Sequence, residues 1–465
     1  MQDRTVAEVN NIDFDIDDQA YELDRIAMDA ILNAVETDDK MELVALLDQM
    51  HSADIADFLE QIPSKERSDF LALWGVDIDG TVLSEMDENL RVDVIEDLSG
   101  DVMAEALKDL ETDDVVDLIE DLKVPEKVRV LEALKDAERV VVEQALQYPE
   151  DTAGRLMQRE LVMAPVHWTV ADALDYLRVA SDLPAQFYDV VIVDPKLQPL
   201  GRVALSVLIS SARDILLADI MDANFQIIPV TQSQEDVAYA FNQYHMVSAP
   251  VIDDIGRLVG MITIDDAMEV LHDQAEEDLK LLAGVGNESL TDNVFVTTRQ
   301  RFPWLMVNLI TAVLASVVIA QFSGVIEALV ALAVLMPIVA SMGGNAATQT
   351  MTIAVRALAN KDLTSSNAYR VIRREVMVGL LSGLVFSVII GIVALIWFRS
   401  TMLGIVLGLA IIVNFLVAGI AGILIPIALE KLKVDPALAS GAFVTTVTDV
   451  IGFFGFLGLA AIILL

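Results

Sequence analysis

The hydrophobic pattern divides the chain of 465 residues into two unlike parts near residue 301. After this point, five apolar stretches are each long enough to cross a hydrocarbon core of about 30 Å as a helix of about 20 residues. They predict five transmembrane helices, at 303–322, 326–355, 376–398, 402–429 and 437–465. The second, fourth and fifth stretches exceed the necessary length, which favours tilted or broken helices.

Before residue 301 the apolar residues form short, periodic segments and no long apolar stretch. Residues 1–24 are polar and acidic, which predicts a loose tail. In 25–150, apolar residues recur every three to four positions with acids on the opposite faces. This pattern predicts short helix pairs stacked as a small α-solenoid.

A sequence repeat follows in 151–268. One copy begins near Leu156 and the next near Ile220. Each contains a helical stretch, a β-rich run, a glycine turn, a second strand and a second helix, which predicts a β-α-β-β-α unit used twice. The helix after the second copy continues through a series of acids towards the first span.

We therefore predict a multidomain chain: a cytoplasmic α-solenoid, a tandem α/β pair, an acidic connecting helix and a five-helix α-helical transmembrane domain. The predicted parts are an acidic tail at 1–24, the helical domain at 25–150, the α/β pair at 151–268, the connecting helix and linker at 269–298, and the membrane domain at 299–465.

Charge follows the same division. Of 71 acids and 30 bases, six acids and eight bases lie after residue 301, so the preceding part carries a net charge of −43. This surplus excludes nucleic acid as a partner and favours cations. By the positive-inside rule, the bases flanking the spans place the N-terminal part in the cytoplasm and the C-terminus outside a cell inner membrane. These bases are Arg299, Arg301, Arg356, Lys361, Arg370, Arg373, Arg374, Lys431 and Lys433.

Asp449 is an acid that lies well inside a predicted span. A carboxylate in the bilayer is costly and usually marks an ion path. The alternative is a structural ion pair, but the predicted spans offer no central Lys, Arg or His. Spacings of three and four place a polar stripe on the same helix face; it comprises Gly441, Thr445, Thr448 and Gly452.

The second predicted span also carries a polar face. Ser341, Asn345 and Gln349 recur at intervals of four. The adjacent Gly343 and Gly344 permit either an unwound backbone or close helix packing. These are oxygen ligands and neutral dipoles, and the chain has no Cys. They suit a hard ion such as Mg²⁺ better than zinc, nickel or iron, which favour imidazole or thiolate.

The order of these parts resembles the MgtE family of magnesium channels and transporters, and the repeat resembles a tandem pair of CBS domains. The matching segments are 148–157 (YPEDTAGRLM), 337–349 (PIVASMGGNAATQ), 356–358 (RAL), 434–438 (VDPAL) and 448–450 (TDV).

The resemblance implies a homodimer with the ion path between its two membrane domains and closure by cytoplasmic magnesium. The polar residues described above, Ser341, Asn345, Gly441, Thr445 and Asp449, are the candidate magnesium ligands of this path. The matching regulatory magnesium ligands are Asp113, Asp117, Asp266, Glu269, Glu277 and Asp278. Gln274, Ser233 and His245 stand where some relatives carry acids, so the number of regulatory sites stays open.

CBS pairs commonly bind adenine nucleotides. Gly260, Thr263 and Asp266 fit the ribose-contacting pattern of such repeats, whereas the first copy has 201–206 (GRVALS) with no such Asp. The pattern is compatible with one ATP site at the second repeat. The sequence leaves open whether the Asp266 carboxylate contacts ribose or magnesium.

Two other functions remain open at this stage. A transporter coupled to protons or sodium would use Asp449 as a proton carrier. A membrane-anchored nucleotide sensor would use its spans only as an anchor, and the intramembrane polar stripe argues against it. We find no nucleophile–base pair and no phosphate-binding loop, so we do not expect an enzyme.

Overall fold

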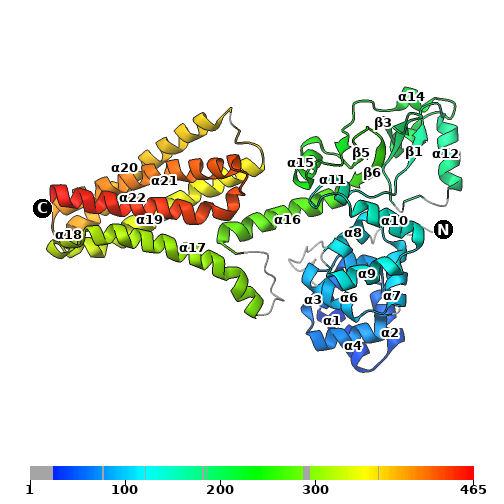
Figure 1. Cartoon of the computed structure of the whole chain (residues 1–465), viewed down its shortest axis with the longest axis horizontal. Coiled ribbons are helices and arrows are strands. Elements are labelled where there is room, and N and C mark those ends of the chain that lie inside the picture. Colours follow the sequence, from blue (N-terminus) through cyan, green and yellow to red (C-terminus); the bar gives the residue numbers. More distant parts are fainter. Residues whose placement is uncertain are drawn as a thin grey trace, which may run out of the picture. The chain divides into compact units, whose positions relative to one another are not determined.

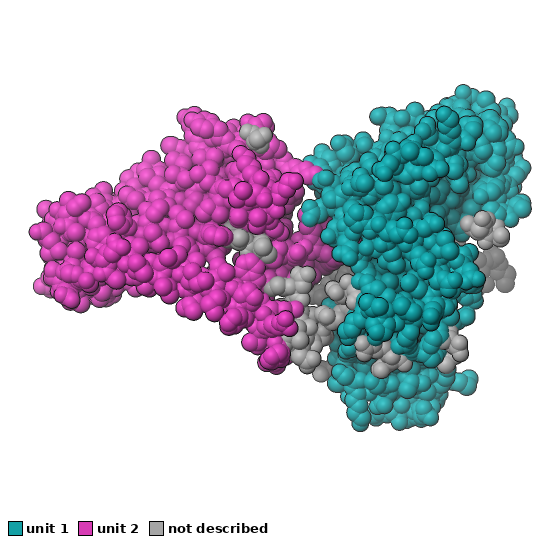
Figure 2. All heavy atoms as spheres, viewed as in Figure 1, with its two compact units in different colours: residues 1–267 teal, residues 268–465 magenta. Residues whose placement is uncertain are grey.

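The computed structural model describes residues 25–75, 78–120, 122–180, 183–184, 186–285, 294–364 and 366–465. The chain divides into two compact units, Met1–Ala267 and Met268–Leu465 (Figure 2). The predicted tail at 1–24 and residues 286–293 of the predicted linker lie outside the described residues.

The first unit begins with an all-helical region, in agreement with its periodicity. One apolar core extends from Ile31 to Ala145, and the rings of Phe58, Phe70 and Trp74 contact one another within it. Its helices are α1 (Arg25–Glu36), α2 (Lys40–Leu47), α3 (Ser52–Gln61), α4 (Ser64–Trp74), α5 (Gly80–Ser84), α6 (Glu88–Asp97), α7 (Gly100–Ala106), a 3-10 turn (Leu107–Asp109), α8 (Thr112–Glu120), α9 (Val124–Ala133) and α10 (Asp136–Ala145).

Two three-stranded sheets follow, and they confirm the predicted repeat. In each, the first strand is parallel and the third antiparallel to the central strand. The first set is β1 (Met163–Pro165), α12 (Val170–Val179), β2 (Asp189–Val193), β3 (Pro199–Ala204) and α13 (Leu205–Ser210). The second is β4 (Ile228–Pro229), α15 (Gln234–Tyr244), β5 (Ser248–Ile252) and β6 (Leu258–Thr263).

The two repeats exchange their leading segments. Helix α11 (Ala153–Leu156) precedes the first sheet, yet Met157 belongs to the core of the second. Helix α14 (Leu217–Ile220) precedes the second sheet, yet Met221 packs on the core of the first. Glycine allows both crossings, because a Cβ on Gly260 would lie 2.6 Å from the Met157 sulfur and one on Gly201 2.8 Å from that of Met221.

Among the residues that the structure describes, the second unit contains five helices that are long and apolar enough to cross a membrane, as predicted (Figure 1). Helix α21 contacts α19, α20 and α22, while α17 packs on α22. The helices are α17 (Val294–Gln321), α18 (Ser323–Ala328), α19 (Ala331–Ala359), α20 (Ala368–Phe398), α21 (Thr401–Lys431) and α22 (Pro436–Ile463). Helix α16 (Ile264–Ala283) begins in the first unit and ends in the second.

Glycines set the spacing between α20 and α21. A Cβ on Gly379 would lie 2.6 Å from the Phe415 carbonyl oxygen, and one on Gly404 2.8 Å from that of Gly391. The two backbones therefore approach each other where no side chain intervenes. In the second predicted span, for which the sequence favours a tilted or broken helix, the structure has a break, because α18 ends at Ala328 and α19 begins at Ala331.

Candidate functional site

Helix α22 presents the predicted polar stripe. Its N-terminus is capped by Asp435, whose carboxylate accepts from the Ala437 amide at 2.7 Å. Asp449 is half-buried. The Thr445 hydroxyl donates to the Gly441 carbonyl at 2.8 Å, which leaves the hydroxyl oxygen able to accept from water or a hydrated ion.

Helix α19 keeps its α-helical backbone through Gly343 and Gly344, so of the two alternatives close packing is the one observed. Ser341, Asn345 and Gln349 are exposed, whereas the opposite face of the helix is buried in the subunit. The predicted polar face therefore points away from the core of its own subunit.

In the described part of the chain, no three His, Cys, Asp or Glu side chains lie close enough together to hold a metal ion. Asp449 is thus not part of a group of three such side chains among the described residues. Any ion that it holds needs neutral oxygens, water or a second chain around it.

Glu375 corrects the sequence analysis of the spans. We placed the third span at 376–398, but α20 begins at Ala368 and includes this acid, which is buried. Its carboxylate accepts from the Thr350 hydroxyl at 3.5 Å and lies 4.0 Å from the Arg374 guanidinium. Asp449 is therefore one of two acids within the spanning helices whose side chains are partly or fully withdrawn from the surface.

The end of α16 packs on the membrane helices within the second unit. Leu281 belongs to an apolar cluster with Ala347 of α19 and Val444 of α22. A Cβ on Gly441 would lie 3.9 Å from the Leu282 carbonyl oxygen. The polar stripe of α22 thus begins beside the last turn of the connecting helix.

A separate acidic cluster lies within the first unit, where α8 meets the start of the two-sheet repeat. Glu160 accepts from the backbone amide of Thr112 at 3.2 Å and from its hydroxyl at 2.7 Å, and so caps α8. Asp266 accepts from the Thr263 hydroxyl at 2.7 Å and caps α16. The acids of the cluster are Glu111, Asp113, Asp114, Glu160, Asp265 and Asp266.

Burial and repulsion by neighbouring acids raise the pKa values of four of these carboxylates, those of Glu111, Asp113, Asp114 and Asp266. Burial is the main cause, and repulsion by the Glu160 carboxylate the second, that raises the pKa of Glu111 to about 7. Burial is also the main cause, and repulsion by the Asp266 carboxylate the second, that raises the pKa of Asp113 well above its usual value. Burial raises the pKa of Asp266 to about 7, although its hydrogen bonds with Thr263 act in the opposite direction. The first turns of α8 and α16 contribute positive helix dipoles, which offset part of the repulsion.

The remaining regulatory candidates lie elsewhere. Asp117 is exposed and forms an ion pair with the buried Arg91. Farther along α16, in the second unit, Glu269 and Glu277 are exposed and Asp278 is half-buried.

Sequence reasoning missed Glu111, Asp114, Glu160 and Asp265. Glu111, Asp114 and Asp265 lie within two positions of a predicted ligand. The acids at the first turn of each helix are the sequence signal that could have found them. Glu160 had no local signal, because its partner Thr112 lies 48 residues earlier in the chain.

The predicted nucleotide residues are engaged within the protein. Gly260 accommodates Met157, and Thr263 bonds to Asp266. A cavity of about 530 Å³ lies instead beside the first sheet, lined among others by Tyr188, Arg202 and His245.

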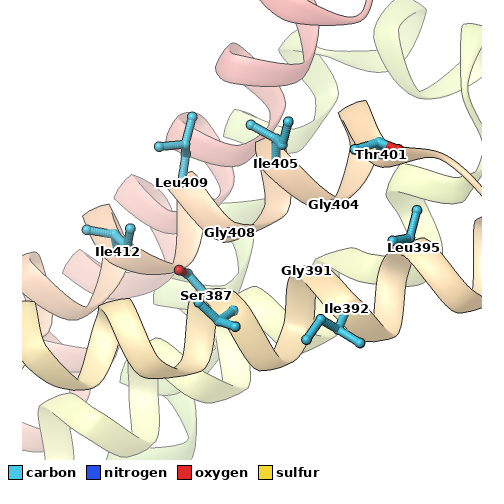
Figure 3. Close-up of a pocket in the computed structure, with 11 residues that line it drawn as sticks. Ser387, Gly391, Ile392, Leu395, Thr401, Gly404, Ile405, Gly408, Leu409 and Ile412 are labelled. Carbon is cyan, nitrogen blue, oxygen red and sulfur yellow. The ribbon is translucent and has the colours of Figure 1, made fainter.

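A second pocket, of about 340 Å³, lies between α20 and α21 and is lined mainly by apolar side chains and glycine (Figure 3). Ser387 and Thr401 contribute hydroxyl groups to its lining. None of the candidate pore residues takes part in it, so this pocket is separate from the polar stripe.

A membrane domain with an intramembrane carboxylate, joined to an acidic helical domain and a CBS pair, defines a multi-pass transport protein with regulatory domains. Three family models match: a divalent cation transporter domain, MgtE, at 336–459; the MgtE intracellular N domain at 50–151; and a CBS domain at 217–273.

Curated relatives agree with these matches. A magnesium transporter MgtE of Enterococcus faecalis is 36% identical over 302 residues, covering 65% of this chain and 67% of the relative. One of Bacillus subtilis is 29% identical over 417 residues, covering 90% and 92%. The chain belongs to the MgtE family of magnesium transporters, which is a family of transporters and not of enzymes.

Among solved structures, the cytosolic domain of the Mg²⁺ channel MgtE in complex with ATP is similar, with a TM-score of 0.49 and 27% identity. The match covers 52% of this chain and 99% of that domain.

Proposed function

We propose that the chain forms a homodimeric magnesium channel whose ion path runs between the two membrane domains and past Asp449. The observation that carries this proposal is the exposed polar face of α19, which includes Ser341 and Asn345. In a bilayer such groups need hydrogen-bonding partners or water. A second subunit facing this surface would enclose a polar path with one Asp449 on each side.

The side chains of this path suit a hydrated magnesium ion. Magnesium gives up its water reluctantly and is usually held by one or two carboxylates with several waters retained. The two Asp449 carboxylates would supply the charge. Ser341, Asn345, Thr445 and the carbonyl of Gly441 would bind the water shell.

We propose that the acidic cluster of the first unit is the sensor. Glu111, Asp113 and Asp266 repel one another at two helix N-termini and do not form a ready three-carboxylate site as they stand. A divalent cation would draw them together, with water completing its shell, and would hold α8 against α16. Because α16 continues to Leu281, which packs on α19 and α22, one helix links the cluster to the ion path. Magnesium binding would thereby hold the path closed.

Other acids of α16 complete the proposed sensor. We propose that Glu269, Glu277 and Asp278 contribute ligands to further magnesium sites, which a second subunit would complete. Asp117 is the least suited candidate, because Arg91 already neutralises its charge.

The topology follows from the same proposal. The acidic domains lie in the cytoplasm of the cell, and the C-terminus after α22 lies outside its inner membrane. Flanking bases such as Arg356, Arg374 and Lys431 support this orientation.

Divalent flux into liposomes tests the function, with free magnesium varied on the cytoplasmic face. We expect magnesium flux that does not saturate, does not depend on a proton or sodium gradient, and stops as cytoplasmic magnesium rises. Saturable flux driven by either gradient would identify a coupled transporter instead. If well-folded protein carried no divalent flux at all, both the channel and the coupled transporter would be ruled out.

Asn345→Ala should change ion preference or transport rate more than stability. The amide can orient water around the ion, and alanine cannot. Flux of magnesium and calcium, measured beside the unfolding midpoint, checks this. Thr311→Ala on α17 is a control, because that hydroxyl donates to the Asn308 carbonyl of its own helix. Unchanged flux and preference would make Asn345 a packing residue.

We further propose that the CBS pair binds an adenine nucleotide, since the cavity beside the first sheet adds a second candidate location to the pattern at Gly260, Thr263 and Asp266. Calorimetry of ATP binding to Thr263→Val and Tyr188→Ala should separate the two. The variant that loses affinity for ATP identifies the repeat that holds the nucleotide. Absence of binding by the unmodified protein would contradict the proposal.

A further inference from the structure

Asn414 is a buried amide in the middle of the membrane domain. It lies on α21, and its side chain is fully buried. Its Nδ2 donates to the carbonyl oxygen of Val339 on α19 at 2.8 Å. Its Oδ1 is buried without a hydrogen-bond partner among the described residues. A buried amide whose carbonyl oxygen has no hydrogen-bond partner is unusual and calls for an explanation.

Two glycines on different helices make room for this amide. A Cβ on Gly343 of α19 would collide with the Asn414 side chain. A Cβ on Gly452 of α22 would lie 2.8 Å from Asn414 Nδ2 and 3.2 Å from Oδ1. The amide is therefore wedged between the two helices that carry the proposed ion path.

Both contacts lie close to proposed pore residues. Gly343 precedes Asn345 by two positions, and Gly452 follows Asp449 by three, less than one helical turn in each case. A shift or rotation of α19 against α22 at the wedge would alter the placement of both side chains.

We propose that Asn414 is a positioning residue of the ion path. Its bond to Val339 and its contacts with Gly343 and Gly452 set the separation and rotation of α19 relative to α22. Asn345 and Asp449 are thereby held at the spacing that fits a hydrated magnesium ion. This role rests on the function proposed above.

Asn414→Ala tests the proposal through ion selectivity. The ratio of magnesium to calcium flux per folded dimer should fall about threefold or more, the range seen for residues in direct contact. Asn414→Leu fills a similar volume without the hydrogen bond and should also lower the ratio. Leu407→Ala removes a buried side chain from the same helix but not from the wedge. It should reduce stability and leave the ratio unchanged.

Helix spacing gives a readout that is independent of transport. Because the chain has no cysteine, spin labels can be attached through Ile353→Cys on α19 and Phe443→Cys on α22, both exposed positions. Labelled protein is diluted into unlabelled chains so that distances within one subunit dominate. Asn414→Ala should shift or broaden this distance. Gly343→Ala should do so as well, and Asn414→Ala should suppress part of the Gly343→Ala defect.

An unchanged flux ratio and an unchanged label distance in folded Asn414→Ala would overturn the proposal. So would a native ratio in Asn414→Leu, since the hydrogen bond would then have no part in positioning. If Asp449→Ala transported normally while the label distance still shifted in Asn414→Ala, the proposed ion path would fail and the helix wedge would remain.

Discussion

Asp449→Ala should reduce magnesium uptake about a hundredfold or more while the protein still folds and assembles. At roughly 4 Å and an effective dielectric constant near 20, one pair of unit charges contributes about 4 kcal/mol, so losing this carboxylate removes most of the attraction for the ion. Stability should not fall, because the substitution removes a charge that is costly to place in a bilayer. Radioactive or fluorescent flux in liposomes, with size-exclusion chromatography, measures both properties.

Asp449→Asn is the matched companion variant, because it keeps the shape and removes only the charge. Glu327→Ala is the control: this acid is exposed on the short helix α18, and its loss should leave uptake unchanged. Normal uptake by well-folded Asp449→Ala would rule out the assignment of Asp449 to the ion path.

The largest regulatory effect is expected from Glu111→Gln, Asp113→Asn and Asp266→Asn combined. Each amide keeps an acceptor oxygen, so the bond from Thr263 to position 266 can persist. If magnesium coordination closes the channel, this variant stays open at concentrations that shut the unmodified protein. The half-closing concentration should rise about tenfold or more. Flux and protease protection are measured together against free magnesium.

The charge control is Asp57→Asn, Glu66→Gln and Asp69→Asn, which removes as many acids from exposed positions of the helical domain. It should respond to magnesium as the unmodified protein does. If repulsion alone opened the channel, the cluster variant would instead close more easily, even without magnesium. Closure by potassium at matched ionic strength would also contradict a coordinated sensor. Asp117 is left intact, since its removal would strand the buried Arg91 guanidinium.

Asn414 illustrates why part of the site escaped sequence analysis. The rule that singled out Asn345, an amide in an apolar span, applies equally to Asn414. The sequence placed Gly452 on the polar stripe and left Gly343 between an unwound backbone and close packing, but it named no side chain that either glycine contacts. That all three meet depends on how α19, α21 and α22 pack, and a one-dimensional pattern does not contain this information.

The CBS pair gives a second example. Local periodicity predicted the strands and helices of both copies, because β-rich runs and amphipathic helices leave a signal over a few residues. The exchange of the leading segments left no such signal. Met157 and Met221 have equivalent places in the sequence repeat, and nothing local states which sheet each one covers.

The sequence by itself determined the five apolar spans, the helical and α/β character of the preceding regions, the excess of acids and the intramembrane carboxylate Asp449. These follow from composition and short-range periodicity, which act through hydrophobic burial and hydrogen bonding within single elements. Only the tertiary structure decided that Glu160 caps α8 beside Asp113 and Asp266, that Glu375 is buried within a spanning helix, and that Asn414 is wedged between two glycines. Each of these depends on contacts between segments far apart in the chain, where packing and desolvation, and not local propensity, determine which side chains meet.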